Sequence, residues 1–163
     1  MIGLCFFLIL ILMLENFIFF SILRQRNGLI KQSYCQTEKF RIFFELLVEW
    51  FAGDMSGKNI GDWISENGYK TVAIYGMGSL GEVTYLKLCK CKEIYVKYGL
   101  DRDASIKIAG LDIFNLNDSL EKVDLIIVTA VTAYEEIKKE INLKTDFECK
   151  IISLVQLIEE MYV

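Results

Sequence analysis

The chain has 163 residues, which is room for one domain and an appendage, and 53% of them are hydrophobic. Its formal net charge of −4 argues against nucleic acid as the main partner, because binding to phosphates requires clustered Lys and Arg. With no histidine, the sequence excludes Ser-His and Cys-His catalysis and histidine-ligated metal sites. The five cysteines are irregularly spaced, so we interpret them as reduced, small hydrophobic residues and predict no metal site.

Residues 1–23 form a nearly continuous apolar stretch that is interrupted by Glu15, Asn16 and Ser21. A membrane-spanning helix requires about 20 mostly apolar residues. About sixteen Leu, Ile and Phe, at roughly −0.3 to −0.6 kcal/mol each, outweigh a central charge that costs about 3 kcal/mol. We therefore predict a transmembrane anchor over 1–23. A soluble helix that docks on a partner through Glu15 and Asn16 is the alternative.

The residues around the apolar stretch predict an uncleaved, single-pass anchor. No Lys or Arg precedes it and no Ala-x-Ala follows it, so it does not resemble a cleaved signal peptide. Basic residues follow it instead, at Arg24, Arg26, Lys31, Lys39 and Arg41. By the positive-inside rule, the chain sits in the cell membrane with its C-terminal domain in the cytoplasm.

Residues 24–68 predict a helical lead-in to the domain. Phe40, Phe43, Phe44, Leu47, Val48 and Phe51 have the spacing of an amphipathic helix. Thr37 is the predicted N-cap of that helix, and Gly53-Asp54 its end. A turn over 56–59 and a short helix closed by Gly68 follow. This lead-in covers one edge of a sheet or forms a dimer contact.

Residues 69–163 predict a Rossmann-like domain, centred on the sequence TVAIYGMGSLG at 71–81. A short strand runs into Gly-x-Gly-x-x-Gly and a helix follows at once, which is the order of a dinucleotide-binding turn. Gly76 allows the tight turn, Gly78 lets a pyrophosphate approach the backbone, and Gly81 lets the helix pack close to the sheet. The helix N-terminus attracts an anion. The candidate ligand-binding residues here are Gly76, Met77, Gly78, Ser79, Leu80 and Gly81.

An acidic residue follows the next predicted strand, 94–100, at the distance where Rossmann units bind ribose hydroxyls. This residue is Asp101. Arg102 comes directly after it and either holds a phosphate, such as a 2′-phosphate, or is a solvated surface charge.

The other predicted strands are a weak one beginning at 106–110, a fully apolar one at 123–130 and a last one at 150–154. Helices are predicted over 79–89, 117–121, 133–141 and 155–162. The fold class is therefore α/β, a doubly wound parallel sheet of five strands in the order 3-2-1-4-5. Thr129, at the end of its strand, is expected across the crevice from the glycine turn and joins the candidate site.

Three segments carry a resemblance to a family: Gly68–Gly81, Tyr98–Arg102 and Val123–Thr129. They resemble small Rossmann-like domains of bacterial capsule and surface-polysaccharide biosynthesis, and are similar to the nucleotide-sugar-binding N-terminal domain of bacterial sugar acetyltransferases. The resemblance covers about residues 68–157. It implies a ligand of the NAD(P) or nucleotide-sugar type at Gly76, Gly78, Gly81 and Asp101. The chain lacks the acetyltransferases' β-helix domain and histidine base, so acetyl transfer is not implied.

Three functions fit these observations. The first is a membrane-anchored binding module for NAD(P) or a nucleotide sugar, accessory to glycan assembly. The second is a small NAD(P)-dependent oxidoreductase or epimerase-like enzyme; Tyr134 and Lys138 match Tyr-x-x-x-Lys in spacing, in which Tyr donates a proton. The third is a non-binding scaffold that dimerises through the lead-in. No catalytic residue is assigned, and the partner is a second copy or a glycan-assembly protein.

Overall fold

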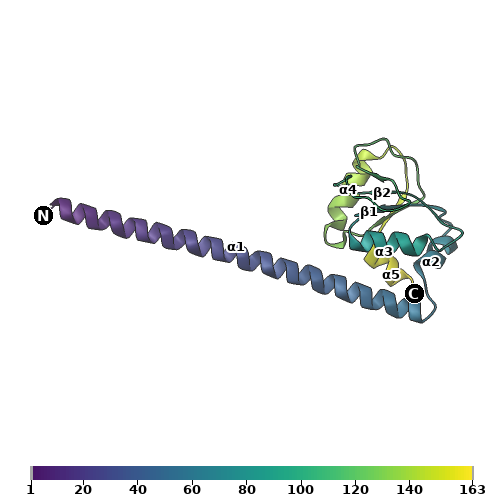
Figure 1. Ribbon diagram of the computed structural model, residues 1–163, viewed down its shortest axis with the longest axis horizontal. Helices are drawn as coiled ribbons and strands as arrows, with labels where there is room; N and C mark the ends of the chain where they lie inside the picture. Colours follow the sequence, from purple (N-terminus) through teal and green to yellow (C-terminus); the bar gives the residue numbers. More distant parts are fainter. Residues whose placement is uncertain (1, 163) are drawn as a thin grey trace. The chain divides into compact units, whose positions relative to one another are not determined.

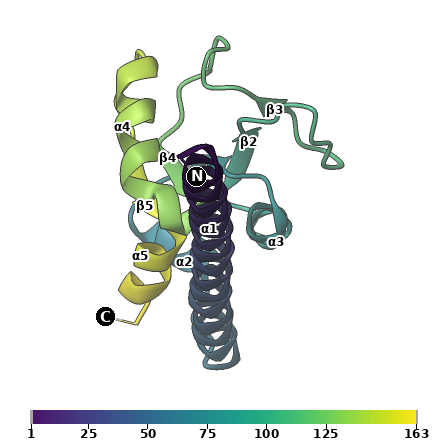
Figure 2. The ribbon, with the colours of Figure 1, turned by 90° about the vertical axis from the view of Figure 1, so that its left-hand side faces the viewer.

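The computed structural model describes the backbone of residues 2–162, and the side chains from Phe17 onward except those at positions 18, 29, 30, 32 and 35. The chain divides into two compact units, Met1–Glu45 and Leu46–Val163. Figure 1 labels its helices and the strands β1 and β2, and Figure 2 labels β3, β4 and β5. In chain order they are α1 (Ile2–Met55), α2 (Ile60–Glu66), β1 (Thr71–Tyr75), α3 (Ser79–Leu88), β2 (Tyr95–Leu100), β3 (Ile113–Phe114), β4 (Leu125–Val128), a 3₁₀ turn η1 (Val131–Ala133), α4 (Tyr134–Lys144), β5 (Lys150–Ser153) and α5 (Leu154–Glu160).

The first unit consists of α1 as far as Glu45, and it corrects one predicted boundary. Thr37 is not an N-cap, because the helix passes through it without a break. The Thr37 hydroxyl donates instead to the carbonyl of Ser33, one turn earlier, at 3.0 Å. One turn later, Arg41 pairs with Glu38 at 2.8 Å and with Glu45 at 2.9 Å. Ion pairs between residues three or four positions apart stabilise a helix in a segment that has few tertiary contacts.

The predicted anchor falls largely on side chains that the structure does not describe. Residues 1–16 of the segment 1–23 lie outside the described side chains. Within the described part of the chain, no helix combines the length and the apolar character needed to cross a membrane.

In the second unit, all five strands are parallel and lie in the order β3-β2-β1-β4-β5, which confirms the predicted topology. β1 is central: Val72 is in register with Val96 of β2 on one side and with Leu125 of β4 on the other. Every residue of β4 is buried. A strand with no exposed face is the physical reason for the uninterrupted apolar sequence there.

Helices cover both faces of the sheet. One cluster of buried side chains joins Ala73 and Tyr75 of β1 to Ile137 and Ile141 of α4. α3 contacts β1 and β2, and α5 contacts β5. Figures 1 and 2 show the strands between α3 and α4. Right-handed crossovers require this arrangement, because the chain leaves β1 toward one edge of the sheet and leaves β4 toward the other.

The region between β2 and β4 differs from the predictions. The third strand is not at 106–110 but at Ile113–Phe114, and it is only two residues long. Gly110 has φ +80°, which ends any extended pairing before it. The predicted helix at 117–121 is absent from this described segment. Asp118 instead accepts the Asn115 N–H at 2.7 Å and closes a turn, which is the ordinary competitor of a helix at Asx residues.

The last turns of α1 belong to the second unit. Leu46 and Trp50 are buried there, at 3% and 4% exposure. Asp54 forms an ion pair with Lys87 of α3. The Tyr162 hydroxyl donates to the carbonyl of Glu49, a residue 113 positions earlier in the sequence. The end of α1 is thus part of the domain's own core.

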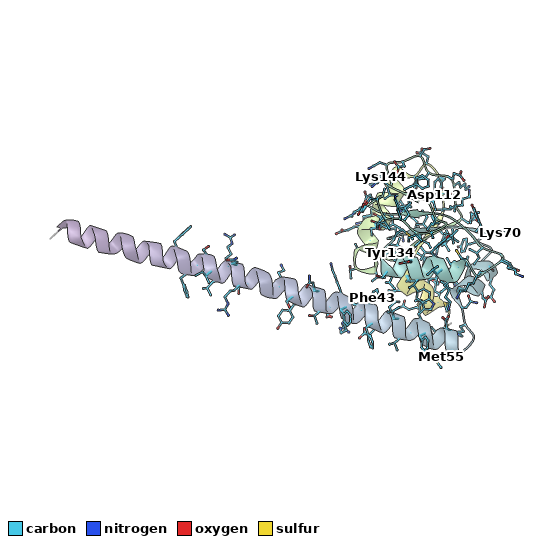
Figure 3. All side chains as sticks on the ribbon, viewed as in Figure 1. Phe43, Met55, Lys70, Asp112, Tyr134 and Lys144 are labelled. Atoms are coloured by element: carbon cyan, nitrogen blue, oxygen red, sulfur yellow. The ribbon has the colours of Figure 1, made fainter. Side chains whose placement is uncertain are left out.

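Asp124 closes the amino-terminal edge of the sheet. One oxygen of its carboxylate accepts the backbone N–H of Thr71 at 2.8 Å, the Thr71 hydroxyl at 2.8 Å and the backbone N–H of Lys70 at 3.0 Å. These hydrogen bonds, with those from Thr71 foremost, lower the pKa of Asp124. Lys70, labelled in Figure 3, marks this end of the domain. No pattern in the sequence marked Asp124 for this role.

We predict that Asp124→Asn lowers the free energy of unfolding by about 1–2 kcal/mol at pH 7, because an amide accepts the same donors without the charge. A carboxyl group with a lowered pKa stabilises the fold above its unfolded-state pKa of about 3.9. That stabilisation is lost as the pH falls through the lower folded-state pKa, so the difference between the two proteins shrinks below about pH 4. Urea unfolding of the full chain in mild detergent, monitored by tryptophan fluorescence at several pH values, measures the difference in the free energy of unfolding. Asp146→Asn, at an exposed position, is the control, and an equal loss in both variants would contradict the role of Asp124.

Candidate functional site

The glycine turn begins where β1 ends, at Tyr75. Gly76 has φ +93°, a conformation that glycine adopts without strain. Its N–H donates to the Leu100 carbonyl at 2.8 Å, so the turn stays tied to β2. A Cβ atom on Gly76 would lie 2.8 Å from the Thr129 hydroxyl oxygen. Both the backbone angle and the space around it therefore require glycine at the position predicted for the tight turn.

Gly81 allows α3 to lie against that turn. A Cβ atom at this position would lie 2.2 Å from the Gly76 carbonyl oxygen, a distance that no packing arrangement tolerates. The obstacle is backbone and cannot rotate away. The helix approaches the strand only because residue 81 has no side chain, as the spacing of the three glycines predicts.

Gly78 differs from the other two because its surroundings are open. No described atom lies within 4 Å of the position that its Cβ would take. Its φ of −72° is one that any residue adopts. Gly78 is the N-cap of α3 and, among the described side chains, none caps the helix there. The first-turn N–H groups of Ser79, Leu80 and Gly81 are therefore left for solvent or a ligand.

The contribution of this turn to binding would come from its backbone. Ser79 is exposed, whereas Leu80 and Met77 are buried at 7% and 3%. The Met77 side chain packs over Gly99 of β2, where a Cβ atom would lie 2.9 Å from its Cγ. A glycine inside a predicted strand is a signal for such a close approach, although it does not identify the approaching residue.

Asp101 reaches the glycine turn from the end of β2. Its Oδ2 accepts the Met77 N–H at 2.7 Å, and its Oδ1 accepts the Asp103 N–H at 3.0 Å. The structure thus brings together the acidic residue and the glycine turn, as the sequence predicts. The first partner of the carboxylate is protein backbone, however, and the ribose role stays a prediction. Each carboxylate oxygen retains capacity for a second donor.

Arg102 lies beside Asp101 on the surface. Its side chain is 72% exposed and its Nη2 is 3.8 Å from Glu140 Oε2 of α4. An exposed pair at this distance contributes little to stability and leaves the guanidinium accessible. Burial raises the pKa of the Tyr75 hydroxyl, and the nearby Arg102 opposes that rise. Tyr75 and Glu140 thus neighbour the candidate site, and no pattern in the sequence marked them.

Thr129 lies next to the turn, but its hydroxyl is already engaged. It donates to the Gly76 carbonyl, and the Tyr75 carbonyl is 3.1 Å away. The side chain is buried at 5% exposure. Thr129 therefore fixes the turn from the β4 side, and the structure assigns it a positioning role.

The Tyr-x-x-x-Lys spacing does not produce a proton donor. Tyr134, labelled in Figure 3, is buried, and its hydroxyl donates to the Ile151 carbonyl of β5 at 3.1 Å. The Lys138 Nζ lies 5.5 Å from the Tyr134 ring centroid, over the ring. The Tyr134 hydroxyl thus joins α4 to β5, and Lys138 contacts the ring of Tyr134 on its own helix.

Two surface hollows of the second unit lie elsewhere. One, of about 450 Å³, is lined by residues that include Asp54, Lys58, Lys87 and Lys90. Another, of about 270 Å³, lies over β2 and β3, beside Tyr95 and Phe114. Neither hollow is lined by Gly76, Gly78 or Gly81. The candidate site is therefore defined by the backbone geometry of the glycine turn and not by a surface hollow.

Comparison of the chain with models of known protein families, with curated proteins and with solved structures gave no match. The class of the protein therefore rests on its sheet: an α/β domain with five parallel strands in the order 3-2-1-4-5.

We predict that Gly81→Ala and Gly78→Ala have different outcomes although both add one methyl group to the same turn. Gly81→Ala should lower the free energy of unfolding by about 1–3 kcal/mol or more, because the new Cβ overlaps a backbone carbonyl. Gly78→Ala should lower it by less than about 1 kcal/mol, the usual cost of Ala at an N-cap, since the site is open and its φ is ordinary. Urea unfolding of the full-length variants measures both. Equal unfolding midpoints would contradict the close approach of α3 to Gly76.

Proposed function

We propose that this protein is a membrane-anchored binding module for a nucleotide-type ligand, either NAD(P) or a nucleotide sugar. The observation that carries the proposal is the open face of Gly78 at the uncapped start of α3. α3 has ten residues, long enough for its aligned peptide dipoles to favour an anion at that end. A pyrophosphate placed there accepts the free N–H groups of the first turn.

Asp101 supports the proposal by its position. Its carboxylate is held against the Met77 N–H, on the same turn, and its remaining lone pairs suit the hydroxyl groups of a ribose. A phosphate at that point would meet a like charge, unless Arg102 compensated for it. In this proposal Arg102 decides between NAD and NADP, because it is the exposed cation next to Asp101.

The anchor and the pathway belong to the proposal as well. Residues 1–23 insert into the cell membrane, and the α/β domain lies in the cytoplasm. The exposure of Phe17, Phe19 and Phe20 supports this, as does the presence of Arg24 and Arg26 directly after them. The role in surface-polysaccharide assembly rests on the resemblance of Gly68–Gly81, Tyr98–Arg102 and Val123–Thr129 alone.

The test is ligand-dependent thermal stability of the full chain in mild detergent. NAD, NADP, UDP-sugars, CDP-sugars and CoA are each compared with buffer. A ligand that binds only the folded state raises the free energy of unfolding by about 2.7 kcal/mol at a hundredfold excess over its Kd. Gly78→Asp places a negative charge where the pyrophosphate is expected, and we predict at least a tenfold loss of affinity.

Ser119→Asp is the matched control, because it adds the same charge at an exposed loop position between β3 and β4. It should bind like the unmodified protein. Arg102→Ala, assayed with NAD and NADP, tests the phosphate role: selective loss of NADP binding supports it. If no ligand stabilises the protein, or if Gly78→Asp binds equally well, the binding proposal is wrong and the scaffold function takes its place.

A further inference from the structure

The hollow beside the end of α1 gathers positive charge on a protein that is negative overall. Its volume is about 450 Å³, and all the residues that line it belong to the second unit. Three of them are lysines, Lys58, Lys87 and Lys90, and one is acidic, Asp54. We call this hollow the lysine hollow. The formal net charge of the whole chain is −4, so the local excess of cations does not follow from the composition.

The three lysines come from separate segments that the fold brings together. Lys58 lies in the turn between α1 and α2, and its Nζ is 5.2 Å from the centroid of the Tyr162 ring. Lys87 is in the last turn of α3, and Lys90 comes two residues after that helix ends. Burial lowers the pKa of the Lys87 ammonium, and the charge of Lys90 lowers it further. An anion that enters the hollow relieves this repulsion between like charges.

Two carboxylates lie at the lysine hollow and reduce its charge without cancelling it. Asp54 pairs with Lys87. Asp62 is held at the rim by the side-chain amide of a lining asparagine, at 2.9 Å. Within the described part of the chain, Lys58 and Lys90 form no ion pair. Lysines at the end of a helix also complement its dipole, which accounts for Lys87 and Lys90 but not for Lys58.

Asp54 contributes to the lysine hollow an acceptor that lacks a donor. Its Oδ2 pairs with Lys87. Its Oδ1 is buried and has no hydrogen-bond partner among the described residues. A buried carboxylate oxygen that is left unpaired is costly, because it has lost its hydration. A ligand that suits this hollow therefore offers acceptors to the lysines and one O–H or N–H group to Asp54.

We propose that the lysine hollow binds a phosphate group that keeps one proton. The ionised oxygens of the phosphate accept hydrogen bonds from Lys58 and Lys90, and its P–O–H group donates to Asp54 Oδ1. Sulfate has the same tetrahedral shape but no proton near neutral pH, so it would meet Asp54 as a like charge and leave Oδ1 unpaired.

The place and size of the lysine hollow define the ligand further. The hollow lies at the opposite end of α3 from Gly78, so the proposal does not depend on the ligand of the glycine turn. Its volume exceeds that of one phosphate ion, so the bound group is either free phosphate or the end of a small monoester.

Isothermal titration calorimetry of the full chain in mild detergent tests the proposal. Inorganic phosphate, glycerol phosphate and sulfate are compared at equal ionic strength and at pH 6, because the second pKa of a phosphate monoester is about 6. We expect inorganic phosphate to bind at least tenfold more tightly than sulfate. Tighter binding of glycerol phosphate than of inorganic phosphate identifies a monoester, and the reverse order identifies the free ion. Failure of both phosphates to bind overturns the proposal, and so does equal binding of inorganic phosphate and sulfate.

Lys58→Gln combined with Lys90→Gln should weaken phosphate binding at least tenfold, because it removes the two cations that have no carboxylate partner in the described chain. Lys139→Gln combined with Lys150→Gln is the matched control. It removes the same charge at exposed positions of α4 and β5, outside the hollow, and should leave the Kd unchanged. Equal binding by both double variants would contradict the site.

Gly78→Asp separates the lysine hollow from the glycine turn. This variant should bind phosphate as tightly as the unmodified protein, since Gly78 lies at the other end of α3. Loss of phosphate binding in Gly78→Asp would assign the anion to the turn and overturn the proposal. Far-UV circular dichroism and urea midpoints of the Lys58 and Lys90 double variant should match those of the unmodified protein, because both lysines are exposed. A weaker affinity in that variant then reports on the site and not on the fold.

Discussion

The approach of α3 to the end of β1, with no space for a Cβ atom between Gly81 and the Gly76 carbonyl, is the contact on which the carboxyl edge of the sheet depends. It determines where α3 begins, and therefore where its unpaired N–H groups lie. It also determines the position of Met77, whose N–H meets Asp101 and whose side chain covers Gly99. This backbone contact thus places the α3 end of the candidate site, while β2 brings Asp101 and β4 brings Thr129 to it.

β1 is held by a carboxylate at each end. Asp124 accepts N–H groups of Lys70 and Thr71 where the strand enters the sheet, and Asp101 accepts the N–H of Met77 just after it leaves. The first aspartate lies on β4's side of the strand and the second on β2's side. The two carboxylates differ in their surroundings. One oxygen of Asp124 accepts hydrogen bonds from three donors, whereas Asp101 lies beside the open glycine turn. Similar chemistry therefore serves stability at one edge and is available for a ligand at the other.

Which features of the fold and of the candidate site could be predicted depended on the kind of pattern each leaves in the sequence. The buried strands and the roles of Gly76 and Gly81 were readable, because burial on two faces and steric exclusion leave few alternatives in sequence. β3 was misplaced, since a two-residue strand is defined by pairing with β2 rather than by its own residues. Thr37 failed as a cap because a local preference yielded to a continuous helix. The backbone partner of Asp101 and the engaged hydroxyl of Thr129 depend on distances between segments far apart in sequence, which no local pattern contains.

The hydrogen bond from Tyr162 to the Glu49 carbonyl has a consequence for synthesis on the ribosome. The last turns of α1 are translated early, yet Trp50 reaches its buried position only in a unit that includes α3 and α5. The hydrogen bond between Tyr162 and Glu49 therefore forms only after the chain has been extended by 113 residues beyond Glu49. Folding of this domain is in that sense delayed by its topology, and a helix that emerges first is among the elements that pack last.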